Sequence, residues 1–249
     1  MSGHNKWSTI KRKKGALDAK RGKLFTKLIK EISIAAKEGG GDPDGNPRLR
    51  LAIQNAKGAN MPKENIERAI KKGIGADAAD YIEASYEGYA PHGVAVFVEC
   101  MTDNMNRTVS SVRSIFNRYG GSLGTKGSLE FIFDRKGVFE GPIPENFDED
   151  AFTLELIDAG AEDVDVDTEE GYYEVMCAME DFGNLQKKFE EMKINPENAA
   201  LRRIPKTLVD LDDEALLKVM KLIDALEDDD DVQKVYHNIN ITEKQMELI

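Results

Sequence analysis

Long uncharged stretches are missing from this 249-residue sequence, and cysteines are few. The longest segment without lysine, arginine, aspartate or glutamate runs from Gly88 to Val98, which is eleven residues. A membrane-spanning helix needs about 20 apolar residues, so we expect no transmembrane segment and no membrane partner. The two cysteines, Cys100 and Cys177, stand in apolar runs, which is typical of reduced, buried thiols and predicts a cytoplasmic protein.

Motifs for metal, nucleotide and nucleophilic chemistry are also missing. His4, His92 and His237 are far apart and no two cysteines are close in sequence, so no zinc pattern exists. Neither a P-loop nor a G-x-G-x-x-G fingerprint occurs. A G-x-S-x-G match at 120–124 lies after a predicted helix and before a predicted strand, the reverse of a nucleophile elbow. We therefore expect no enzyme activity, cofactor, metal or small-molecule substrate, with carboxylates gathered only by the fold as the open alternative.

The charge of the chain changes sign along the sequence. Lysine and arginine number 34 against 46 aspartate and glutamate residues, a net charge of −12. That mean value argues against a nucleic-acid partner, because an acidic surface repels phosphate. Residues 1–75, however, contain 18 cationic and 7 acidic residues, a net charge of +11, and the remainder carries −23. A basic segment joined to an acidic body indicates contact with nucleic acid.

Basic residues are densest in residues 1–30, where Asp18 is the single acid and Trp7, the only tryptophan, lies among the cations. The ten cations are Lys6, Lys11, Arg12, Lys13, Lys14, Lys20, Arg21, Lys23, Lys27 and Lys30. We expect the cations of 11–14 and 20–30 to contact phosphates, which contribute affinity but no sequence information. Trp7 would stack on an exposed base, which favours structured RNA over duplex DNA. The alternative is a solvated basic tail without a partner.

Three helices with a basic outer face are expected near the N-terminus. Apolar residues at three- and four-residue spacing predict a helix over 17–38. Asn46 as cap and Pro47 at the first helical position begin a second helix, and a third begins near Pro62. The last two helices form either an ordinary helical hairpin, which we favour, or a helix-turn-helix with 62–72 as recognition helix.

Strands and helices alternate beyond residue 88. The expected strands are Gly93–Cys100, Ser122–Leu123, Leu129–Phe133, Lys206–Asp210 and Val232–Asn238, and the expected helices are Thr108–Tyr119 and Asp212–Leu226. The intervening residues 134–204 repeat the order β-α-β-β-α-β by themselves, which is typical of a ferredoxin-like unit. We expect the acidic run Glu227–Asp231 to be a solvated turn.

The predicted fold class is therefore α+β, with an N-terminal three-helix domain followed by two ferredoxin-like α+β domains, one inserted in the other. The expected boundaries are 1–78 for the basic three-helix domain, 79–133 plus 205–249 for a discontinuous α+β domain, and 134–204 for the inserted ferredoxin-like domain.

Several motifs resemble those of the YebC/PmpR family. They are Gly3–Lys14, Asp18–Phe25, Asn46–Arg50, Ala59–Pro62, Thr102–Thr108 and Asp231–Asn238. The match covers nearly the whole chain with the motifs in family order, and it is least specific over 134–204. The resemblance implies the same three-domain architecture and a non-enzymatic, nucleic-acid-binding regulator of gene expression.

The resemblance leaves the nucleic acid open. YebC/PmpR proteins are described as DNA-binding transcriptional regulators, but the family also includes a mitochondrial translation activator and bacterial members that act at the ribosome. The alternative is therefore a ribosome-associated translation factor that binds ribosomal RNA. A rival of another class is a protein-interaction adaptor whose two ferredoxin-like units dock partners.

The candidate nucleic-acid-binding residues are Trp7, Lys11, Arg12, Lys13, Lys14, Lys20, Arg21, Lys23, Lys27, Lys30, Arg48, Arg50 and Arg107. For Arg107 two interpretations compete. The Asp, Asn and Thr residues of 102–108 are good helix caps, which gives the segment a structural role. Arg107 would alternatively point at a phosphate near a helix start, where backbone amides also point.

Overall fold

The computed structural model describes the backbone of residues 17–76, 78, 80–145 and 147–249, with side chains from residue 22 onward. The described residues fall into two compact units. The first lies within Met1–Lys27, Ala79–Asp134 and Ile204–Ile249, and the second within Leu28–Ala78 and Arg135–Arg203. The predicted α+β class is confirmed, because N-terminal helices precede antiparallel sheets in the chain.

The first unit is built on a four-stranded antiparallel sheet with the strand order β3-β1-β2-β9. Its strands are β1 (Ile82–Tyr89), β2 (Ala95–Thr102), β3 (Ser122–Leu123) and β9 (Val232–His237). Its helices are the 3-10 turn Pro91–Gly93, α5 (Met105–Arg118), α8 (Asp213–Glu227) and the short α9 (Glu243–Met246). A small second sheet pairs β8 (Val209–Asp210) with β10 (Ile239–Asn240) in parallel.

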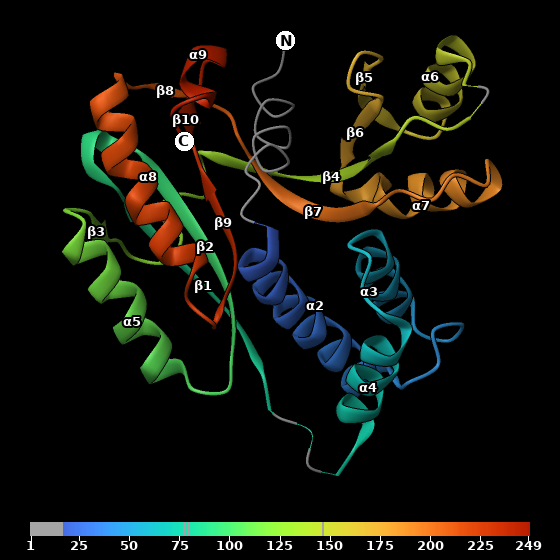
Figure 1. The fold of residues 1–249 in the computed structure, drawn as a ribbon, viewed down its shortest axis with the longest axis horizontal. Helices are drawn as coiled ribbons and strands as arrows, with labels where there is room; N and C mark the ends of the chain where they lie inside the picture. The colour runs from blue at the N-terminus through green and yellow to red at the C-terminus, as the bar shows by residue number, and fades with distance from the viewer. Residues whose placement is uncertain (1–16, 77, 79, 146) are drawn as a thin grey trace. The chain divides into compact units, whose positions relative to one another are not determined.

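Helices α5 and α8 lie on the same face of this sheet (Figure 1). Val112 and Phe116 of α5 and Leu222 of α8 are fully buried against Val98 of β2. On the other face Phe97 packs in a smaller apolar cluster with the turn that precedes residue 133. The central strand β2 is thus covered on both faces, which explains why its sequence is an almost continuous apolar run.

Strand β1 was not anticipated and occupies a central place in the sheet. It pairs with β2 along its whole length, from Ile82 opposite Thr102 to Tyr89 opposite Ala95. Its sequence, IEASYEGY, mixes polar, small and aromatic residues, so no clear alternation marks it. The expected strand at 206–210 is wrong for most of its length, since only its last two residues form β8, outside the main sheet.

The expected strand Leu129–Phe133 is also wrong, because a buried carboxylate holds this segment in a turn. Glu87 of β1 is 3% exposed and accepts hydrogen bonds from the backbone N–H groups of Gly127, at 2.7 Å, and Leu129, at 2.6 Å. Amides that donate to this carboxylate are not available to a strand ladder. The chain resumes extended structure only at Phe133.

The second unit contains the expected β-α-β-β-α-β order. Its elements are β4 (Phe133–Pro142), α6 (Glu149–Asp158), β5 (Ala161–Asp167), β6 (Tyr172–Ala178), a 3-10 turn (Met179–Asp181), α7 (Phe182–Glu191) and β7 (Asn198–Pro205). The strand order β5-β6-β4-β7 is that of a ferredoxin-like sheet, which confirms the prediction. Phe152 and Leu156 of α6 and Leu185 of α7 pack on Phe139 and Tyr173 of the sheet.

The three predicted N-terminal helices are confirmed as α2 (Leu17–Gly39), α3 (Pro47–Gly58) and α4 (Lys63–Ile74). Buried Asn46 caps α3 by accepting from the N–H of Leu49 at 3.0 Å, and its amide nitrogen donates to the carbonyl oxygens of Ala35 and Gly40. Gly73 allows α4 to approach α2, since a Cβ there would lie 2.3 Å from the Ser33 carbonyl oxygen. The first turn of α3 is therefore tied to the last turns of α2.

Helix α3 packs on the edge of β7 within the second unit. The side chain of Asn55 donates to the carbonyl oxygen of Ala199 and accepts from its N–H, both at 2.9 Å, as a neighbouring strand would. Gly58 brings the two backbones together, because a Cβ there would lie 1.8 Å from the Glu197 carbonyl oxygen. The three-domain division stays a prediction, because close packing does not determine which segments fold by themselves.

We expect Gly58→Ala to destabilise the protein by about 2 kcal/mol, because the added methyl group must displace backbone rather than a flexible side chain. Urea denaturation measures the effect. Gly183→Ala is the matched control, since nothing lies within 4 Å of a Cβ at that position of α7. Equal stability of the two variants would contradict the close approach of α3 and β7.

Candidate nucleic-acid interface

The basic N-terminal residues fall partly outside the described structure. Trp7, Lys11, Arg12, Lys13 and Lys14 all lie outside the described residues. The backbones of Lys20 and Arg21 belong to α2, and their side chains are likewise outside the description. The predicted phosphate contacts of the six cations and the predicted base stacking of Trp7 therefore stay predictions.

Lys23 and Lys27 of α2 contact the acidic turn between α8 and β9, within the first unit. The Lys23 Nζ atom lies 2.6 Å from Asp228 Oδ1, and Lys27 Nζ donates to the Glu227 carbonyl oxygen at 3.1 Å. The acidic run is a turn as predicted, but the expectation that it is solvated is wrong at Asp231, which is buried, and the run binds cations of the chain itself. The side chains of Lys23 and Asp228 are 43% and 69% exposed, and an exposed pair of this kind contributes at most about 1 kcal/mol.

The remaining candidates of α2 and α3 belong to the second unit. Lys30 is half-buried on α2, whereas Arg48 and Arg50 are exposed on the first turn of α3. Arg48 forms an ion pair with Glu38 of α2. Arg50 has no ion-pair or hydrogen-bond partner among the described residues. Of these three candidates, Arg50 is therefore the one that the described structure leaves with an uncompensated charge.

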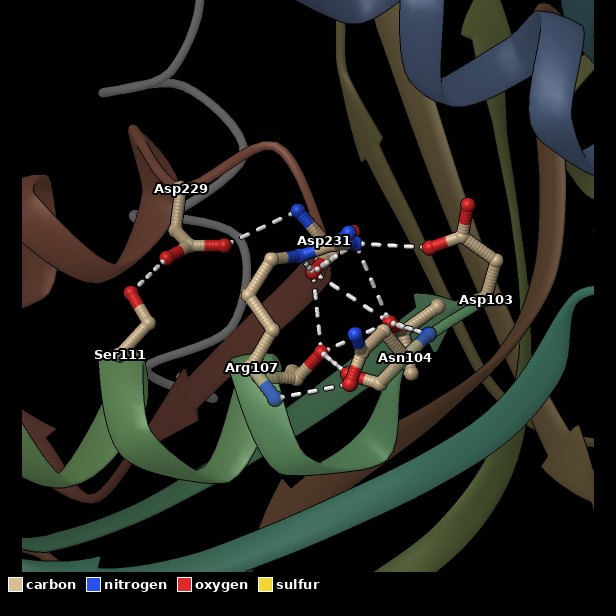
Figure 2. A network of polar contacts seen from close by, with 8 residues as sticks. Asp103, Asn104, Arg107, Ser111, Asp229 and Asp231 are labelled. Carbon is tan, nitrogen blue, oxygen red and sulfur yellow. Dashed lines mark hydrogen bonds and ion pairs between the residues drawn. The ribbon is translucent and has the colours of Figure 1, made fainter.

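Arg107 lies in a dense polar network at the start of α5, which Figure 2 shows. Its Nη2 atom lies 2.8 Å from Asp231 Oδ2 and 2.9 Å from Asp103 Oδ1, and its Nε atom is 3.1 Å from Asp231 Oδ2. Hydrogen bonds to these two carboxylates raise the pKa of Arg107. Its backbone N–H donates to Asn104 Oδ1 at 3.0 Å, which caps α5 as the sequence predicted.

Asp231 is the acceptor at the centre of this network. Its side chain is 9% exposed and accepts from Arg107 and from the hydroxyls of Thr102, at 3.3 Å, and Thr108, at 2.9 Å. Next to it, Ser111 of α5 donates to Asp229, which accepts from the Asp231 N–H at 2.9 Å (Figure 2). The two sequence motifs that begin at Thr102 and Asp231 therefore meet in space and hold β2, α5 and the α8–β9 turn together.

A second polar cluster, in the sheet of the second unit, was missed by sequence reasoning. Arg202 of β7 forms ion pairs with Glu140 of β4 and, at 3.9 Å, with Glu174 of β6. Asn198 donates to Glu140 at 2.9 Å. Burial raises the pKa of Glu174 to about 7; Arg202 opposes this shift, and the carboxylate of Glu140 adds to it. Period-2 alternation places Glu174 on one face of β6, but only the sheet order brings the three charged residues together.

The described residues give no sign of a metal site or a membrane span. No group of three or more histidine, cysteine, aspartate or glutamate residues within the described ranges is arranged to hold a metal ion. No helix in the described part of the chain is long and apolar enough to cross a membrane.

Sequence comparison decides the family. A model described as the TACO1/YebC protein N-terminal domain matches residues 5–76, and one described as the TACO1/YebC second and third domain matches residues 81–239. The chain belongs to the TACO1/YebC family. The resemblance to YebC/PmpR proteins is thereby confirmed over nearly the whole sequence.

Relatives in the TACO1/YebC family match the full length. A protein of Amoebophilus asiaticus is 59% identical over 96% of this chain and 98% of its own length, and one of Persephonella marina is 51% identical over 100% of both. Each is named a "Probable transcriptional regulatory protein", which assigns those relatives a regulatory role. The crystal structure of a conserved hypothetical protein from Aquifex aeolicus is similar with a TM-score of 0.80, at 45% identity over 93% of this chain and 95% of that chain.

We expect Asp231→Asn to destabilise the TACO1/YebC fold of this chain by about 2 kcal/mol, because it weakens charge-assisted hydrogen bonds and leaves Arg107 facing a neutral amide. Thermal and urea unfolding measure the loss. Glu247→Gln, which removes an exposed carboxylate of the same unit, is the control and should leave stability unchanged. An Asp231→Asn protein as stable as this control would contradict the structural role of the network.

We expect Glu174→Gln to stabilise the protein at pH 8 by about 3 kcal/mol. Since the pKa of Glu174 is raised to about 7 from 4.5, its contribution to stability is full below pH 4.5 and is lost as the pH rises through 7. The neutral glutamine does not undergo this loss, so the difference between variant and parent should shrink as the pH falls to 5. Urea denaturation at both pH values measures it, with exposed Glu169→Gln as control.

Proposed function

We propose that this chain is a non-catalytic regulator of gene expression that binds duplex DNA through the basic residues of its N-terminal segment. The observation that carries the proposal is the separation of charge, +11 over residues 1–75 against −23 over the remainder. The acidic body repels phosphate and limits non-specific adhesion, so the basic segment sets the orientation on the nucleic acid. The name of the full-length relatives supports the regulatory role.

Exposed cations of the described helices support the same interpretation. Arg50 of α3 and Arg68, Lys71 and Lys72 of α4 are exposed, and none has an ion-pair or hydrogen-bond partner among the described residues. Among the described residues, Lys23 forms an exposed ion pair with Asp228, which a phosphate can replace at small cost. These residues can therefore add phosphate contacts to those expected of residues 11–14.

The choice of DNA over ribosomal RNA follows the regulatory name of the relatives. The structured-RNA alternative depends on Trp7, whose stacking on an unpaired base would give preference for single-stranded or looped RNA. The adaptor alternative needs no nucleic acid. Binding of the protein to matched DNA duplexes, RNA hairpins and an acidic protein ligand, measured at the same ionic strength, separates the three.

We expect the affinity for a 20-base-pair DNA duplex to fall steeply with salt. If about six cations engage phosphates, the slope of log K against log salt concentration is about −5. Fluorescence anisotropy between 100 and 300 mM NaCl measures it. A flat response would remove the phosphate-contact model, and tighter binding of the RNA hairpin than of DNA across this range would favour the ribosomal alternative.

We expect a combined Lys11→Gln, Arg12→Gln, Lys13→Gln and Lys14→Gln protein to lose three to four units of this slope and most of its affinity. Substitution is preferable to deletion of residues 1–30, because it keeps Leu28, which is buried. The matched control neutralises four exposed lysines of the acidic body, which are Lys187, Lys193, Lys221 and Lys244. Equal losses in the two proteins would show that total charge, and not the N-terminal segment, drives binding.

A further inference from the structure

We propose that the exposed face of α5 is a second nucleic-acid contact, which binds the phosphate backbone through Arg113 and Arg118. This inference rests on the proposed function and adds a binding surface in the first unit, far along the chain from the basic N-terminal segment. Helix α5 contains no aspartate or glutamate in its 14 residues, although the chain as a whole carries −12.

The polar residues of α5 lie on one face of the helix. Ser110, Arg113, Ser114, Asn117 and Arg118 line one open hollow of the surface, and all five are exposed. At about 100° per residue, the two arginines fall on opposite sides of the row formed by the serines and the asparagine. We call these five residues the α5 face. Its guanidinium, hydroxyl and amide groups are those that proteins use to contact phosphate oxygens.

The charges of the α5 face are not compensated within the described structure. Neither Arg113 nor Arg118 has an ion-pair or hydrogen-bond partner among the described residues. Arg107, about two turns from Arg113 and three from Arg118 on the same helix, is by contrast bound to Asp231 and Asp103. Arg107 therefore has a structural role, whereas Arg113 and Arg118 are available to bind an external anion.

The α5 face is also held rigidly. Asn104 caps the start of the helix, and the Asp231 network fixes its first turns. Val112 and Phe116 are fully buried on the opposite side. A helix anchored at its start and along its buried side loses little conformational entropy when its exposed side chains bind a ligand. The absence of apolar side chains on this face favours a phosphate backbone over a hydrophobic protein partner.

The test compares two full-length proteins of equal charge. Arg113→Gln with Arg118→Gln neutralises the α5 face, and Lys221→Gln with Lys244→Gln removes two exposed cations elsewhere in the same unit. We expect the first protein to bind duplex DNA about tenfold more weakly, with the salt slope reduced by about two units and equally for different DNA sequences. The control should stay close to the parent, and thermal unfolding should be unchanged in both.

A third variant, Ser114→Asp, places a carboxylate between the two arginines and should weaken DNA binding at least as much as the double variant.

If the parent protein binds DNA and the arginine variant behaves like the lysine control, this inference fails and the proposed function stands. If the parent shows no salt-dependent binding, the proposed function fails. Binding of poly-glutamate is measured in parallel. If the arginine substitutions weaken poly-glutamate binding as strongly as DNA binding, the α5 face recognises negative charge alone and the phosphate assignment is overturned.

Discussion

The first unit depends on one buried carboxylate. Asp231 is almost removed from solvent, so its charge is tolerated only because several donors meet it. Those donors come from the end of β2 and the first turn of α5, while the Asp231 carbonyl oxygen accepts from the N–H of Met101 at 2.8 Å. One side chain thereby sets the position of α5 on the sheet, and with it the direction in which the outer face of that helix points.

In the second unit, uncharged side chains satisfy the buried backbone groups between the helices and the sheet. Asn46 and Asn55 satisfy backbone groups at a helix end and at a sheet edge, where no regular ladder is available. Gly58 and Gly73 permit the close approaches that these hydrogen bonds require. Arg202 of β7 adds charged contacts between the strands, to Glu140 of β4 and Glu174 of β6.

Charge is distributed to serve both folding and binding. Part of the acidic run after α8 is used internally, by Lys23, Ser111 and Arg107. Exposed cations without an ion-pair partner among the described residues include Arg50 of α3, Lys71 of α4 and Arg113 of α5. A chain with a net charge of −12 can thus present locally positive surfaces. The reason is that some of its acidic residues are neutralised in specific ion pairs, and the charges are not spread evenly.

Local sequence determined the helices and the β-α-β-β-α-β unit, because apolar periodicity and caps such as Asn46 and Asn104 act within a few residues. It also located the basic segment. Tertiary structure alone decided that β1 lies beside β2, that Glu87 turns a predicted strand into a loop, and that Arg107 belongs to Asp231, 124 residues away. Those outcomes depend on contacts between residues that are far apart in the sequence. The periodicity of a short sequence segment carries no information about such contacts.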